Sequence, residues 1–146
     1  MLFKREDIVN FSVKIGCKRE LHTKGMVVSV LGDVVCLATL SGDYQDQIYY
    51  MNGIKSPSEV YYCGAYGNGA LSRIDSGNRE TQKNSAVTLV NGKTNFIYFF
   101  EKIHEDSDFF YFHGRYKYLR YEIVKSYNPE HKEEILFHLL FVDKPF

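Results

Sequence analysis

The sequence predicts an α+β domain built on a strongly curved sheet or a small β-barrel with one main helix. The chain has 146 residues, which suits a single domain spanning 1–146 that buries a core without disulfides. Hydrophobic residues make up 45% and aromatic residues 16% of the chain, which excludes the composition of a disordered protein. Six to eight short segments rich in β-branched and aromatic residues, without a linker or an internal repeat, complete the pattern.

The first strand pair is predicted between Thr23 and Leu40. Two β-branched runs, Met26–Leu31 and Val34–Leu40, are separated by Gly32-Asp33. Gly and Asp favour the tight turns that join antiparallel strands. We therefore expect a hairpin.

A long loop that leads into a strand is predicted next. Tyr44–Tyr50 is polar and aromatic, Asn52-Gly53 interrupts it, and Pro57 precedes the aromatic run Val60–Cys63. The following stretch, Gly64–Gly77, holds four glycines in fourteen positions. Glycine allows close backbone approach and positive φ, so we expect this stretch to be irregular.

The main helix is predicted after this loop. Ser76-Gly77-Asn78 supplies side chains that can cap the free amides of a helix start, and Gly92 ends the segment after Val90. The sequence shows no second segment with comparable helix signals.

The C-terminal part is predicted to be strands. They are Asn95–Lys102, Asp108–His113, Leu119–Tyr127 and Glu134–Val142, each rich in β-branched and aromatic residues. The Asn95–Lys102 segment is apolar at consecutive positions, which favours a place in the middle of the sheet.

Charge and cysteine content restrict the function classes. Eighteen basic and eighteen acidic residues cancel, so any binding of nucleic acid must use a local patch. Three cysteines without a CxxC pair, and a start unlike a signal peptide, fit the reducing cytoplasm of a bacterial or archaeal cell. No apolar run approaches the roughly 18 residues that span a bilayer, so a membrane role is not expected.

Four blocks, in order along the chain, carry a family resemblance. They are Ser41-Gly42-Asp43-Tyr44-Gln45-Asp46-Gln47, Tyr62-Cys63-Gly64, Gly77-Asn78 and Tyr111-Phe112-His113-Gly114-Arg115-Tyr116. From about Arg19 to Phe141 the chain resembles the SRA (YDG) domain of the PUA-like superfamily. That family reads methylated cytosine in chromatin proteins and in modification-dependent restriction endonucleases.

The resemblance implies a pocket for a flipped base. Tyr44 and Tyr62 correspond to the two stacking tyrosines, Gln47 stands where the family has an acid, and Cys63 where it has a threonine. The remaining pocket positions are Asp46, Ser41 and Gly42. Flipping a base costs a few kcal/mol, and stacking on an aromatic ring returns about 1–3 kcal/mol. An amide at position 47 both donates and accepts hydrogen bonds, which leaves the identity of the base open.

The resemblance also implies two loops that contact DNA, and a turn at the Tyr111–Tyr116 block. Gly25 corresponds to the glycine that opens a minor-groove loop, and the stretch from Gly64 to Asn78 to the loop that enters from the other side. The implied contacts are Arg19, Lys24, Gly25, Arg73, Asn78, Arg79 and Lys83, with Lys14 and Lys18 as further candidates for phosphate contacts.

The expected function is recognition of a modified base, 5-methylcytosine or a related base, in double-stranded DNA, without a cofactor and without catalysis by this chain. In a restriction system, cleavage would need a nuclease domain or subunit elsewhere. Two alternatives remain: a PUA-like RNA-binding module, and an enzyme domain that binds a small nucleotide.

Catalytic and metal sites find little support in the sequence. The histidines and cysteines match no zinc or HNH-type spacing, and the glycines match no phosphate-binding loop. Cys63 has no histidine nearby in sequence to activate it, so we interpret it as a packing residue. The acidic cluster of Glu101, Glu105, Asp106 and Asp108 is typical of a solvated hairpin loop.

Overall fold

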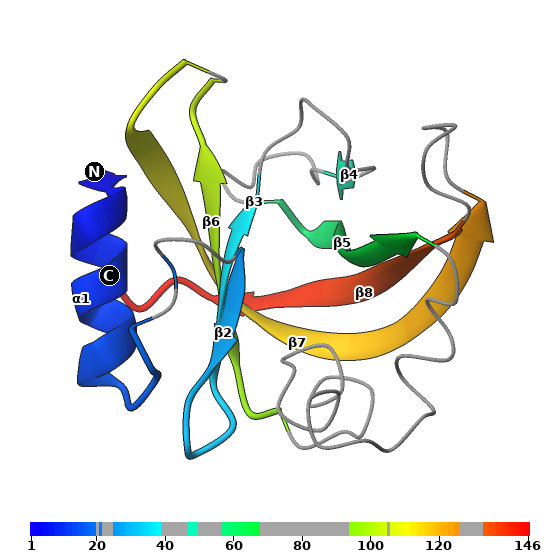
Figure 1. Cartoon of the computed structure of the whole chain (residues 1–146), viewed down its shortest axis with the longest axis horizontal. Helices are drawn as coiled ribbons and strands as arrows, with labels where there is room; N and C mark the ends of the chain where they lie inside the picture. The colour runs from blue at the N-terminus through cyan, green and yellow to red at the C-terminus, as the bar shows by residue number, and fades with distance from the viewer. Residues whose placement is uncertain are drawn as a thin grey trace.

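The computed structural model describes residues 1–19, 21, 25–38, 47–49, 57–67, 94–104, 106–125 and 133–146, with the backbone alone at 47–49, 63–67 and 133–135. Within these ranges the chain forms one helix and eight strands (Figure 1). They are β1 (Leu2–Lys4), α1 (Arg5–Lys14), β2 (Met26–Val28), β3 (Val34–Ala38), β4 (Gln47–Tyr49), β5 (Glu59–Gly67), β6 (Ile97–Lys102), β7 (Phe109–Lys125) and β8 (Glu133–Asp143).

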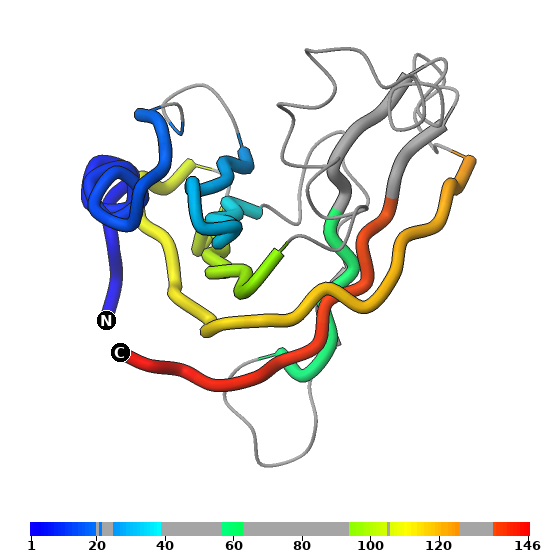
Figure 2. The backbone as a smooth tube through the Cα atoms, turned by 90° about the horizontal axis from the view of Figure 1, so that it is seen from below, coloured from blue at the N-terminus to red at the C-terminus, as the bar shows by residue number. Residues whose placement is uncertain are grey.

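The strands form one curved sheet in the order β2-β3-β6-β7-β8-β5-β4, and β1 pairs with β7 outside this path. β3 and β6 are parallel, and the other pairs are antiparallel. Seen from below, β7 and β8 bend together away from α1 (Figure 2). The predicted α+β class with a curved sheet is confirmed, and the described strands leave the sheet open between β2 and β4, so they do not form a closed barrel.

The predicted hairpin is confirmed. β2 and β3 are antiparallel, with Val28 opposite Val34. Their turn is wider than the two residues expected, and hydrogen bonds between Ser29 and Asp33 close it. The amide of Ser29 donates to the carbonyl of Asp33 at 2.7 Å, and the amide of Asp33 donates to Ser29 Oγ at 2.9 Å. The Ser29 side chain thus supplies a hydrogen bond that fixes this turn.

The helix α1 was not predicted. At its start, the carboxylate of Asp7 accepts a hydrogen bond from the amide of Lys4 at 2.9 Å. At its end, Gly16 has φ +100° and Cys17 donates to the carbonyl of Ser12 at 2.9 Å, the αL termination that glycine favours. Its buried side chains are Ile8, Val9 and Ser12, so only a narrow stripe faces the sheet.

Hydrophobic side chains are buried on both faces of the sheet. On the α1 face, Ile8 and Val9 pack with Val35, Leu37 and other apolar residues. The other face holds a second cluster: Val34, Cys36, Ala38, Val60, Tyr62, Ile97, Phe99, Tyr116, Phe137 and Leu139. We call this second set the concave core, because within it Tyr62 of β5 contacts Phe99 of β6, although β7 and β8 separate these two strands in the sheet. All five residues of β3 are buried, since alternate side chains enter each cluster.

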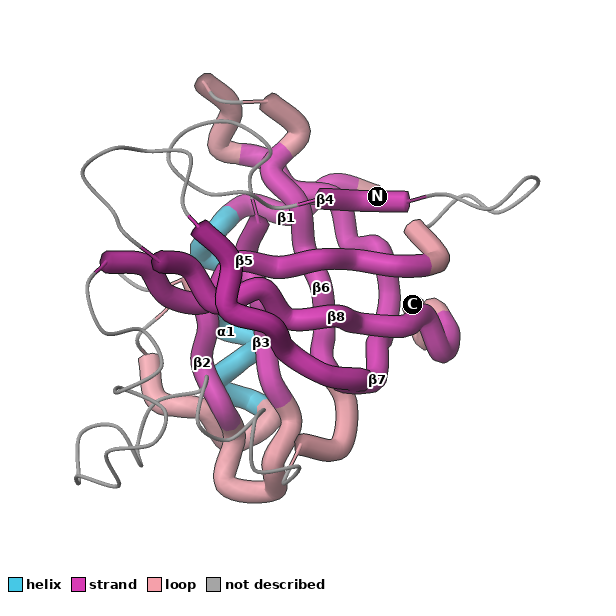
Figure 3. The backbone as a smooth tube through the Cα atoms, turned by 90° about the vertical axis from the view of Figure 1, so that its right-hand side faces the viewer, coloured by secondary structure: helices cyan, strands magenta, loops and turns pink. Residues whose placement is uncertain are grey.

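The predicted strands Asp108–His113 and Leu119–Tyr127 are one continuous strand, β7, so the expected turn at the Tyr111–Tyr116 block is wrong. A β-bulge replaces the turn: Phe100 pairs with Phe112 whereas Phe99 pairs with Gly114, which leaves His113 as the extra residue. Figure 3 shows β7 running unbroken, first beside β6 and then, after a bend, beside β8. A glycine followed by a polar residue therefore marked a bulge and not a chain reversal.

Two further expectations concern the segment after Val60. β5 continues through Gly67, so the first residues of the predicted irregular stretch are part of a strand paired with β8. The irregularity appears as a register shift between Cys63 and Ala65. The predicted helix between Ser76 and Val90 lies outside the described residues.

Two other strand predictions are confirmed. β6 lies between β3 and β7 inside the sheet, as its apolar pattern indicated. β8 matches the predicted Glu134–Val142 segment closely. In the described part of the chain, no helix has the length and apolarity required to cross a bilayer.

We predict that Gly114→Ala destabilises the fold by about 3 kcal/mol. Gly114 has φ +130°, and a Cβ there would lie 2.5 Å from the carbonyl oxygen of Asp143 and 2.8 Å from the ring of Phe141. Urea unfolding followed by circular dichroism measures the effect, with Lys117→Ala on the same strand as an exposed control. Equal stability of the two variants would contradict the bulge geometry.

Candidate functional site

Tyr62, the predicted stacking tyrosine on β5, lies in the concave core with 5% of its surface exposed. Its hydroxyl lies 3.0 Å from the carbonyl oxygen of Gly25 and 3.1 Å from that of Leu37, and it shares its single hydrogen between them. The ring packs edge-on against Phe99, with centroids 6.3 Å apart. In this conformation Tyr62 is a largely buried core side chain whose ring and hydroxyl are both held by other residues.

The pairing of β4 with β5 brings two of the resemblance blocks together. Gln47 lies opposite Tyr61 in the antiparallel register, one position from Tyr62. Cys63 follows on β5 and pairs with Leu136 of β8. Gln47, Tyr62 and Cys63 therefore occupy neighbouring places in the sheet, although fourteen residues separate Gln47 from Tyr62 in the sequence.

Most of the other predicted site residues lie outside the described residues: Ser41, Gly42, Tyr44, Asp46, Lys24, Arg73, Asn78, Arg79 and Lys83. Gly25 is described, and its carbonyl accepts hydrogen bonds from Tyr62 and from the amide of Leu37 at 2.8 Å. Arg19 contacts α1: Nη1 donates to Asn10 Oδ1 at 3.0 Å and lies 3.6 Å from Glu6 Oε1. The charge of Arg19 is thus partnered within the protein.

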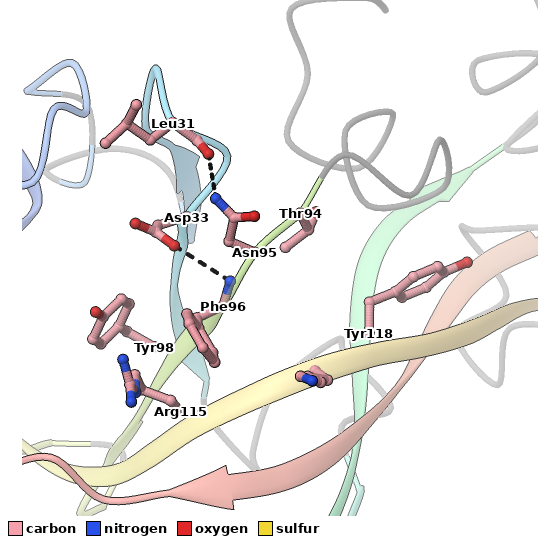
Figure 4. Close-up of a pocket in the computed structure, with 9 residues that line it drawn as sticks. Leu31, Asp33, Thr94, Asn95, Phe96, Tyr98, Arg115 and Tyr118 are labelled. Carbon is pink, nitrogen blue, oxygen red and sulfur yellow. Dashed lines mark hydrogen bonds between the residues drawn. The ribbon is translucent and has the colours of Figure 1, made fainter.

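A cleft that sequence reasoning did not anticipate lies between the β2–β3 turn, the start of β6 and the middle of β7 (Figure 4). Its volume is about 650 Å³. We call it the β6–β7 cleft, and it is lined by Leu31, Asp33, Thr94, Asn95, Phe96, Tyr98, Arg115, Lys117 and Tyr118. Pockets of this size with aromatic walls and a few polar groups are typical of small-ligand sites.

Arg115 forms one end of the cleft and is held by Asp143 and Phe96. Its Nε and Nη2 donate to the two carboxylate oxygens of Asp143 at 2.7 and 2.6 Å, and its guanidinium lies 4.2 Å from the ring centroid of Phe96. The hydrogen bond from Arg115 holds the pKa of Asp143 below its usual value of 3.8, and the same bond raises the pKa of Arg115. A bidentate, stacked guanidinium is a rigid structural element.

The opposite end of the cleft is fixed to the β2–β3 turn. Asn95 Nδ2 donates to the carbonyl of Leu31 at 2.6 Å, and the amide of Phe96 donates to Asp33 Oδ1 at 3.3 Å. Thr94 Oγ1 is buried and makes no hydrogen bond. A buried hydroxyl without a partner costs about 1–3 kcal/mol, so such groups usually meet a ligand or a water.

Two histidines pair with glutamates on neighbouring strands. His113 Nε2 lies 2.9 Å from Glu101 Oε1, with both side chains about nine-tenths buried. His138 Nε2 lies 3.5 Å from Glu122 Oε1, and its ring packs on Tyr61 with centroids 4.1 Å apart. Glu101 is therefore a buried strand residue, and its predicted place in a solvated acidic loop is wrong.

No group of three or more potential metal ligands gathers among the described residues. The comparisons with family models, with curated proteins and with solved structures give no match for this chain. The proposals below therefore rest on the residues and on the geometry described above.

The β6–β7 cleft joins three segments that are far apart in the sequence, which explains why the sequence did not reveal it. The sequence features that belong to the cleft are weak signals of a site: Asp33 in a turn, Asn95 at the start of a strand, and Arg115 after a glycine. Each has an ordinary structural interpretation, and the parallel pairing of β3 with β6 is what brings Asp33 beside Phe96.

We predict that Asp143→Asn destabilises the protein at about pH 7 and destabilises it less at about pH 2. The folded pKa of Asp143 is lowered, so its contribution is complete above the usual value of 3.8 and is lost as the pH falls through the folded pKa. Urea midpoints at both pH values test this, with Asp106→Asn at an exposed position as the control. A difference between Asp143→Asn and the parent that is as large at the lower pH as at pH 7 would contradict it.

Proposed function

We propose that this chain is an SRA-like recognition module of the PUA-like group, which binds duplex DNA and holds a flipped, modified base against Tyr62 on the concave side of the sheet. The observation that carries the proposal is the pairing of β4 with β5, which puts Gln47 opposite the residue before Tyr62. The chain binds and does not cut, so a nuclease domain or subunit completes a restriction system.

The short stretch of chain between Tyr44 and Gln47 supports a site in which Tyr44 and Tyr62 stack on the same base. Tyr44 is three residues from Gln47, and three residues of extended chain span at most about 11 Å. The covalent chain therefore limits the separation of the Tyr44 and Gln47 Cα atoms to about 11 Å. Two aromatic rings that approach a base from opposite sides return about 1–3 kcal/mol each, enough to offset the cost of flipping.

The hydrogen bonds of the Tyr62 hydroxyl support a fixed position for one of these rings. The carbonyls of Gly25 and Leu37 hold Oη, while Phe99 contacts the ring edge-on. A ring that is ordered before binding loses little entropy when a base stacks on it. Because the ring is covered in this conformation, binding on this proposal must displace the groups that cover its face.

The position of Gly25 supports a link between the pocket and the DNA. A Cβ at this position would lie 3.0 Å from the Tyr62 hydroxyl, a tight contact that glycine avoids. In the resemblance, Gly25 corresponds to the glycine that opens a minor-groove loop. On this proposal the loop and the base pocket move together, because one hydrogen bond joins them.

We predict that the protein prefers one duplex among a set that carries cytosine, 5-methylcytosine, 5-hydroxymethylcytosine or N6-methyladenine. Tyr44→Ala and Tyr62→Leu should each lower that affinity by at least about fivefold, because each removes one stack, whereas Tyr62→Phe should keep the preference. Fluorescence anisotropy at fixed salt measures binding.

Tyr111→Leu is the matched control, since Tyr111 is exposed on β7. Circular dichroism must show that Tyr62→Leu is folded. Equal binding to all four duplexes, or a preference kept by both Tyr44→Ala and Tyr62→Leu, would overturn the proposal. Stronger competition by RNA than by duplex DNA would favour an RNA-binding module instead.

A further inference from the structure

The β6–β7 cleft has two aromatic walls. Figure 4 shows Phe96 and Tyr118 on opposite sides of the opening, with Thr94 and Asn95 between them. Both rings are half-buried. Burial raises the pKa of Tyr118, and the neighbouring Tyr121 adds to this shift, so the phenol is neutral at physiological pH. Neutral rings at the two sides of a cleft suit a planar aromatic ligand.

The two aromatic walls of the cleft are supported by different groups. Phe96 is backed by the Arg115 guanidinium, which is itself fixed by Asp143. Tyr118 packs edge-on against Phe137 of the concave core, with centroids 6.2 Å apart. A ligand between the two rings would therefore contact a fixed face on one side and a side chain that belongs to the concave core on the other.

Polar groups on the upper side of the cleft offer hydrogen bonds. Thr94 Oγ1 has no hydrogen-bond partner among the described residues, and Asn95 donates one of its two amide hydrogens to Leu31 while its oxygen can accept. The carboxylate of Asp33 receives one long hydrogen bond, from the amide of Phe96 at 3.3 Å. These acceptors suit a ligand that carries an amino group, as cytosine, adenine and guanine do.

The two cationic side chains of the cleft, Arg115 and Lys117, differ in whether a carboxylate pairs with them. Arg115 is neutralised by Asp143. Lys117 is exposed, and within the described ranges no carboxylate forms an ion pair with it. An ammonium on a flexible stem binds phosphate as a point charge. The cleft thus combines acceptors between two rings with one available positive charge from β7.

We propose that the β6–β7 cleft binds a nucleotide unit with an amino-bearing base, which lies between Phe96 and Tyr118 while its phosphate pairs with Lys117. The unit is either a free nucleotide or one residue of a nucleic-acid strand. This site is separate from Tyr62, and the proposal does not depend on recognition of a modified base.

The test is calorimetric titration of the whole chain with the four deoxynucleoside 5′-monophosphates, their nucleosides, inorganic phosphate and a short single-stranded oligonucleotide. We expect saturable binding of the amino-bearing nucleotides. Lys117→Gln should weaken binding of nucleotides about tenfold and leave nucleosides unchanged, because it removes only the charge. Tyr118→Leu and Thr94→Val should weaken both classes.

Matched controls are Tyr111→Leu and Lys102→Gln, on β7 and β6 away from the cleft, and both should bind as the parent does. Tyr62→Leu separates this proposal from the previous one, since it should leave nucleotide binding unchanged. Tighter binding of the oligonucleotide assigns the cleft to a strand, and equal binding assigns it to free nucleotides. No saturable binding by any nucleotide, or binding that all three cleft variants retain, would overturn the proposal.

Discussion

The bulge at His113 and Gly114 is the constraint on which the rest of the structure depends. Before it, even-numbered residues of β7 such as Phe112 face α1, and after it even-numbered residues such as Tyr116 enter the concave core. A regular strand would keep alternate residues on one face throughout. The extra residue therefore changes which residues of this seventeen-residue strand face each core.

Both proposed sites follow from this change of face. Tyr116 lies in the same core as Tyr62, and its hydroxyl donates to the carbonyl of Pro57 at 2.6 Å, close to the start of β5. Arg115, its neighbour, faces the other way and lines the β6–β7 cleft. Tyr118 belongs to both places, since it lines the cleft and packs against the concave core. The side chain of Tyr118 therefore lies between the two proposed sites.

The sequence predicted those strands whose residue patterns and bounding turns lie within a short stretch of the chain. The hairpin, β6 and β8 follow from β-branched runs bounded by turn residues. The helix α1 was missed because its buried stripe is narrow, and β7 was divided because Gly114 has the sequence context of a turn. Whether that glycine makes a turn or a bulge depends on Asp143, which approaches it from a strand 29 residues later. The β6–β7 cleft depends on contacts of the same long range.

The measurement that tests the base-flipping claim most directly is the methyl resonance of the preferred modified base, labelled with ¹³C, in a duplex bound to the protein. A base held between Tyr44 and Tyr62 leaves its stacked neighbours and lies over two phenol rings. The account predicts a large upfield ring-current shift of the methyl protons that is lost in Tyr62→Leu but kept in Tyr62→Phe. A methyl resonance that stays at its free-duplex position, while the duplex is bound, would contradict the account.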